Sequence, residues 1–89
     1  MFFAYLKVFW NKFIPMVLSE LKIGQKAIIK HVLAQERVKQ RLAELGLIEG
    51  QTAFVVRFAP FFDPVEIKVG DVYLAIRKGQ ADKIVVEKI

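Results

Sequence analysis

The chain has 89 residues, which is enough for one small domain near the lower limit for a self-sufficient core. Its net charge of +5 comes from lysines and arginines interleaved with acidic residues, so we expect a mildly basic solvated surface rather than a block of cations. The absence of cysteine excludes a disulfide framework and a thiolate metal site. There is no glycine-rich phosphate loop and no serine with a matched base, so we expect a protein that is not an enzyme.

Residues 1–17 form an apolar N-terminal extension that we expect to be helical and separate from the domain at residues 18–89. Two lysines and a proline interrupt the run before it reaches the length of a transmembrane helix, and no signal-peptide pattern is present. The extension could lie on a membrane surface as an amphipathic helix, or pack on the domain or on a second copy, and an ordered or self-associating extension is favoured over membrane insertion. An upstream start, with Met16 as the native first residue, is a further alternative. The aromatic residues of the extension are Phe2, Phe3, Tyr5, Phe9, Trp10 and Phe13.

The first predicted strand, residues 26–33, contains the only histidine of the chain, His31. Its alternation of apolar residues breaks after Ile29, and a bulge near Lys30 and His31 would restore it. No second histidine or cysteine stands at a metal-ligand spacing from His31. We therefore expect His31 to be a half-exposed strand residue.

A helix is predicted over residues 35–45, where Val38, Leu42 and Leu45 recur on one face. Gly46 stands where a residue in the left-handed conformation often ends a helix, and Leu47 is expected to pack back on the last turn.

Four further strands are predicted over residues 52–58, 64–69, 72–77 and 84–87, with a two-residue turn at Gly70-Asp71. Five short strands and one helix indicate a mainly β domain whose strongly bent sheet closes into a small barrel. The predicted core consists of Ile29, Val38, Leu42, Leu45, Val56, Ile67, Leu74, Ile76 and Ile84.

The stretch Arg41-Leu42-x-x-Leu45-Gly46-Leu47-x-x-Gly50 resembles the signature of the ferrous iron transport protein A (FeoA) family. The likeness runs in order from about residue 17 to residue 89 and includes Ala59-Pro60-x-x-Asp63-Pro64. It implies an SH3-like barrel with one inserted helix. It also implies a cytoplasmic, non-enzymatic accessory module of bacterial ferrous iron uptake. Such a module would bind the cytosolic, GTPase-containing part of the permease, ferrous iron transport protein B, and meet the membrane only through that permease.

The loop at residues 59–64 is the main departure from the family pattern, which usually has glycine where this chain has Phe62. Phe61 and Phe62 cannot both point inward from a tight loop, so at least one should cover an open end of the barrel or contact a partner. The predicted partner contacts are Phe61, Phe62 and the turn Leu47-Ile48.

A metal site has weaker support in the sequence. His31, Asp63 and Glu66 are the one set that we name for a divalent transition metal such as Fe2+, and Gln80 stands where the family often has glutamate. Asp63 is instead expected to brace its own turn.

Two alternative functions remain open. One is a metal-responsive SH3-like domain related to those of iron-dependent repressors. The other is a small basic nucleic-acid-binding barrel, against which Phe54, Phe58 and the lysines show no clustered basic-aromatic face in the sequence. We therefore expect no nucleic-acid partner.

Overall fold

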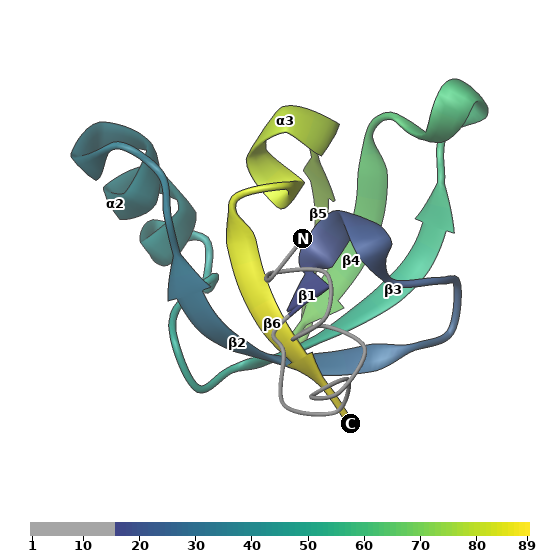
Figure 1. Ribbon diagram of the computed structural model, residues 1–89, viewed down its shortest axis with the longest axis horizontal. Coiled ribbons are helices and arrows are strands. Elements are labelled where there is room, and N and C mark those ends of the chain that lie inside the picture. Colours follow the sequence, from purple (N-terminus) through teal and green to yellow (C-terminus); the bar gives the residue numbers. More distant parts are fainter. Residues whose placement is uncertain (1–15) are drawn as a thin grey trace, which may run out of the picture.

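Six antiparallel strands form one curved sheet in the order β1-β6-β2-β3-β4-β5 (Figure 1). The computed structural model describes residues 16–89, so the expected helical extension lies outside the described residues except for Met16 and Val17. The strands are β1 (Met16–Val17), β2 (Lys26–Val32), β3 (Thr52–Phe58), β4 (Val65–Val69), β5 (Val72–Ile76) and β6 (Ile84–Lys88). The helical segments are η1 (Leu18–Glu20), α2 (Glu36–Glu44), η2 (Pro60–Phe62) and α3 (Lys78–Ala81).

The mainly β architecture and the inserted helix agree with the prediction from the sequence. Strand β1 was not expected, because its two residues were assigned to the N-terminal extension. Met16 and Val17 pair with Val86 and Val85 at the edge of β6, so the sheet begins two residues before the expected boundary.

Strand β2 carries the predicted bulge. Its register with β6 shifts between Ile29 and His31. The shift brings Val32 back to the inner face, where its side chain is buried, as Ile29 is. One strand can therefore supply core residues on both sides of an interruption in its alternation.

Helix α2 ends in the predicted way. Gly46 has a φ of 103°, a backbone conformation that costs glycine little because it has no Cβ. The amide of Gly46 donates to the carbonyl of Ala43, and the amide of Leu47 donates to the carbonyl of Leu42. This pair of hydrogen bonds is the Schellman motif, and it folds the Leu47 side chain into the core.

The core differs from the prediction on β3. The sequence pattern placed Val56 inside, but Ala53 and Val55 face the core and Val56 is partly exposed. Ala53 is paired with Ala27 on β2, and these two small side chains leave room for larger residues from other strands. Leu45 was also wrongly placed in the core, since its side chain is 43% exposed.

The other predicted core residues fall into two groups. Five are buried: Ile29, Leu42, Ile67, Ile76 and Ile84. Val38 and Leu74 are only partly buried and pack against the core from its margin.

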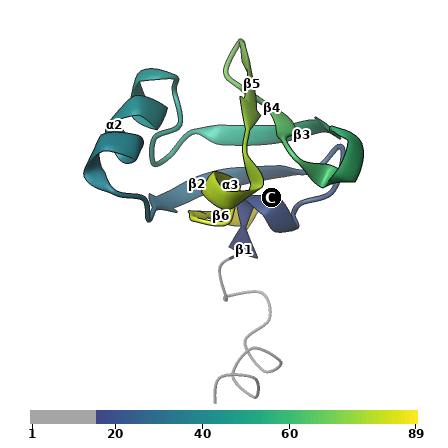
Figure 2. The same ribbon diagram turned by 90° about the horizontal axis from the view of Figure 1, so that it is seen from above.

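The connection between β3 and β4 and helix α2 lie at opposite ends of the molecule (Figures 1 and 2). This separation matters for function, because the predicted contact residues are divided between these two ends.

Candidate partner-binding site

The loop between β3 and β4 exposes two adjacent phenylalanines. The side chain of Phe61 is 95% exposed and that of Phe62 is 70% exposed. Neither ring fills the core, so the loop presents a large apolar surface. Exposed apolar surfaces of this kind are typical of interaction sites.

The backbone of this loop holds both phenylalanines in the left-handed region. Their φ values are 66° for Phe61 and 64° for Phe62. Residues with a Cβ pay about 1–2 kcal/mol each for this conformation. Strain of this kind persists only where the surroundings impose it, and it occurs preferentially at functional sites.

Local hydrogen bonds fix the loop in this conformation. The amide of Phe62 donates to the carbonyl of Ala59 (2.8 Å), and the amide of Ala59 donates to the carbonyl of Pro64 (2.9 Å). The loop therefore presents its aromatic rings from an ordered turn, which lowers the entropy lost when a partner binds.

Asp63 connects the loop to another element. Its Oδ1 accepts a hydrogen bond from the backbone amide of Lys78 (3.0 Å) and lies 3.7 Å from Nη1 of Arg77. The expectation that Asp63 braces its own turn was wrong, because its partners stand at the start of α3.

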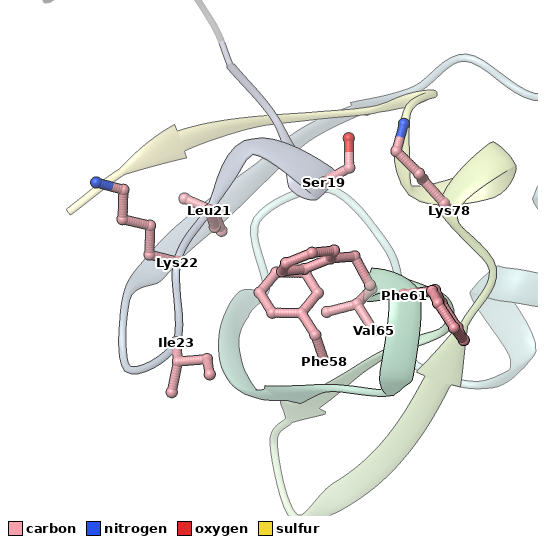
Figure 3. Close-up of a pocket in the computed structure, with 9 residues that line it drawn as sticks. Ser19, Leu21, Lys22, Ile23, Phe58, Phe61, Val65 and Lys78 are labelled. Carbon is pink, nitrogen blue, oxygen red and sulfur yellow. The ribbon is translucent and has the colours of Figure 1, made fainter.

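A groove of about 670 Å³ lies beside the loop. Phe58 forms its centre and packs edge-to-face against Phe62, with the ring centroids 5.8 Å apart. Figure 3 shows Phe58 and Val65 between Ile23 on one side and Phe61 on the other. The remaining lining residues are Ser19, Leu21, Lys22, Phe62 and Lys78. The walls are mostly apolar, and the polar side chains in the lining are those of Ser19, Lys22 and Lys78.

The second predicted contact, the turn after α2, is divided between core and surface. Leu47 is 1% exposed and offers no side-chain surface to a partner, whereas Ile48 is 43% exposed. Only Ile48 remains as a candidate contact there, in the turn that follows α2, and α2 lies at the end of the molecule opposite the aromatic loop (Figure 1).

The three candidate metal ligands are not assembled into one site. Nδ1 of His31 lies 3.5 Å from Glu49, and Glu66 pairs with Nε of Arg57 at 2.6 Å, while Asp63 holds α3. Within residues 16–89 no group of three or more histidine, aspartate or glutamate side chains is placed to hold a metal ion. In this arrangement His31, Asp63 and Glu66 do not share one site.

A basic-aromatic row crosses the outer face of the sheet. Lys26 pairs with Phe54, Phe54 with Lys68, and Lys68 with Tyr73, each on the neighbouring strand. Nζ of Lys68 lies 5.5 Å from the centroid of the Tyr73 ring. The premise that the chain lacks a clustered basic-aromatic face was wrong, because the strand register joins residues that are distant in the sequence.

No helix in the described part of the chain is long and apolar enough to cross a membrane.

Solved structures share this fold. The FeoA protein from Chlorobium tepidum is 40% identical with a TM-score of 0.80, and the match covers 83% of this chain and 70% of that chain. FeoA from Stenotrophomonas maltophilia, described as an SH3 domain protein complexed with zinc, is 31% identical with a TM-score of 0.66. That match covers 80% of this chain and 88% of that one. The bent sheet is thus an SH3-like fold.

A manganese-dependent transcriptional repressor (13% identical) and IdeR from T. acidophilum share the fold at lower identity. IdeR from T. acidophilum is 21% identical with a TM-score of 0.75, and the match covers 84% of this chain and 34% of that chain. This likeness shows a common fold and no more.

Among curated proteins, the chain is 39% identical over 74 residues to an Fe(2+) transport protein A/Fe(2+) transporter FeoB fusion protein from Porphyromonas gingivalis (strain ATCC BAA-308 / W83). The match covers 83% of this chain but only 9% of that relative. The model of the FeoA domain matches residues 16–88. The chain therefore belongs to the FeoA domain family, which is linked to ferrous iron transport.

Proposed function

We propose that the chain is a non-enzymatic accessory module of ferrous iron uptake that binds the cytosolic, GTPase-containing part of the permease at the inner face of the membrane. The observation that carries this proposal is the fused relative, in which a homologous segment belongs to the same protein as an FeoB transporter. In a fusion, the covalent link keeps the segment at a high effective concentration near the transporter without any new contact between them. A separate chain with the same role needs a binding surface of its own.

The aromatic loop supports this proposal because it has the properties of an anchor. Phe61 is an aromatic side chain, almost fully exposed, on a turn that its own hydrogen bonds hold in place. Aromatic anchors that enter a partner pocket commonly carry most of the energy of an interface. Phe61 is therefore our first choice for the contact, with Phe62 beside it and Ile48 as a separate candidate.

The test is a calorimetric titration of the full chain against the cytosolic domain of the cognate permease. Phe61→Ser is expected to weaken binding by about 30-fold, the effect of losing a hot-spot residue. Tyr73→Ser is the matched control, since Tyr73 is an exposed aromatic on another face, and its affinity should stay close to that of the unmodified chain. Ile48→Ser tests the other candidate contact.

The proposal is rejected if the unmodified chain does not bind the domain. Binding that is insensitive to Phe61→Ser would leave the module role standing and remove the loop as its contact surface.

The basic-aromatic row favours one second candidate, binding of a single-stranded nucleic acid. Alternating lysines and aromatic rings suit phosphates and stacked bases, and a groove of about 580 Å³ lies over this row. Fluorescence anisotropy with labelled oligo(dT) at several salt concentrations tests it. This function requires an affinity that falls steeply with salt and is lost in Lys68→Gln. Binding that is absent at low salt excludes it.

A further inference from the structure

We propose that the groove beside the aromatic loop is the docking site for the chain's own N-terminal segment, residues 1–15. This inference does not depend on permease binding. It rests on the composition of the groove, on the place where the described chain begins and on the residue types that precede that place.

The groove lacks a cover among the described residues. Ile23, on one wall, is 63% exposed, and Phe62, which packs on Phe58, is 70% exposed. Leu21 and Val65 also line the groove, although their side chains are almost fully buried. Covering such a surface with an apolar segment is favourable by about 25 cal/mol for each Å² removed from water.

The segment enters the fold next to this groove. Met16 lies at the sheet edge, paired with Val86, and three residues later Ser19 lines the groove. Ser19 is the fourth residue after Pro15, so the two are at most about 14 Å apart. The preceding residues, if extended, would span about 50 Å, which is ample to follow the groove along its length.

The residue types of the segment match the lining of the groove. Six of its side chains are aromatic, and its only charges are Lys7 and Lys12, with no acidic residue. The polar rim of the groove includes Lys22 and Lys78, which do not attract a basic segment. The attraction is therefore apolar, and the docked state should persist in high salt.

Docking in this groove leaves Phe61 available to a partner. Figure 3 shows Phe61 across Val65 from Ile23 and Phe58. The N-terminal segment would cover Phe58, Phe62 and Ile23. Phe62 would then be withdrawn from the permease contact, and Phe61, which lines the other side of the groove and is 95% exposed, would carry that contact. A variant at Ile23 and a variant at Phe61 thus separate the two proposals.

The experiment uses Trp10, because it is the only tryptophan of the chain and lies within the segment. We expect the full-length protein to show blue-shifted tryptophan emission and weak quenching by acrylamide, at low salt and in 1 M salt alike. Ile23→Asp should shift the emission to the red and raise the quenching constant. Val72→Asp is the matched control, since Val72 is another exposed aliphatic residue outside the groove lining, and its spectrum should be unchanged.

Three results would overturn the proposal. The first is the emission of a solvent-exposed tryptophan in the unmodified chain, and the second is a blue shift that survives Ile23→Asp. The third is a blue shift that disappears on dilution together with a dimer in sedimentation, which would assign the groove to the segment of a second copy. If the emission of the unmodified chain is that of an exposed tryptophan and shifts to the blue only when anionic phospholipid vesicles are added, the proposal is also overturned. That outcome would place the segment on a lipid surface.

Discussion

The carboxylate of Asp63 accepts a hydrogen bond from the backbone amide of Lys78, 15 residues later in the chain. It connects the aromatic loop to the first turn of α3, where an amide has no partner within the helix. The loop that carries Phe61 and the short helix beside the groove are thereby held as one unit.

Asp63→Ala should lower stability by about 1 kcal/mol, because it removes a charge-assisted hydrogen bond to a helix terminus. In a domain of this size the corresponding fall in melting temperature is about 4–8 °C. The same variant should weaken permease binding, since the loop loses its connection to α3. Asp63→Asn is the control, because its side-chain oxygen still accepts the bond and should restore most of the stability. Equal melting temperatures for Ala, Asn and the unmodified chain would contradict this role.

Replacing Val55 by alanine should cost about 2 kcal/mol, because two fully buried methyl groups are lost and a cavity is left. Val56→Ala, one position along the same strand, should cost less than about 1 kcal/mol because Val56 is already partly exposed. Urea unfolding of both variants measures the difference. A larger loss of stability in Val56→Ala than in Val55→Ala would mean that Val56 faces the core, as the sequence pattern predicts.

That assignment shows where prediction from the sequence was insufficient. Alternation divides the residues of β3 into two faces, but both faces are apolar, and the larger side chains suggested the wrong one. The choice depends on Ala27, which pairs with Ala53 from another strand and lets small residues face inward. By contrast, the bulge in β2 and the end of α2 follow from local sequence and were predicted correctly.

Part of the candidate site could also be predicted from the sequence, and part could not. Exposure of the phenylalanine pair follows from the shortness of the loop, and the structure places both rings outside. The bond from Asp63 to Lys78 and the row from Lys26 to Tyr73 are tertiary contacts, so no local pattern reveals them. Leu47 was proposed as a partner contact, although the same motif that ends α2 turns it into the core.

Gly46→Val should destabilise the protein by about 1 kcal/mol or more, because valine is β-branched and Gly46 has a positive φ. The cause is backbone strain rather than crowding, because the nearest atom to a new Cβ would be Cγ1 of Val69 at 3.9 Å. Gly79→Ala in α3 is the control. It has open space around its Cβ position and should leave the melting temperature unchanged or higher. A melting temperature unaffected by Gly46→Val would contradict the left-handed helix end.

Acid should destabilise the fold partly through Asp82. The hydroxyl of Ser19 donates a hydrogen bond to this carboxylate and lowers its pKa below the ordinary value of 3.8; Lys78 acts in the same direction and desolvation opposes both. Because the folded-state pKa is the lower one, the stabilising contribution is complete above the ordinary value and is lost as the pH falls through the folded value. Melting temperatures of Asp82→Asn should therefore decline less steeply below about pH 4 than those of the unmodified chain. Ser19→Ala should flatten the profile in the same way, and parallel profiles for all three proteins would exclude this contribution.

Phe61→Gly should separate stability from function. Glycine adopts a φ of 66° without the strain of about 1–2 kcal/mol that phenylalanine carries, although its freer unfolded chain offsets about 0.4–1 kcal/mol of this gain. The exposed ring makes too little contact for its loss to reverse the balance. We therefore expect unchanged or slightly higher stability in urea unfolding together with weaker binding to the permease domain. Phe61→Ser, which keeps the strain and removes the ring, should bind equally weakly without gaining stability. A clear loss of stability in Phe61→Gly would mean that the ring supports the fold, and the loop would then no longer be a strained surface kept for a partner.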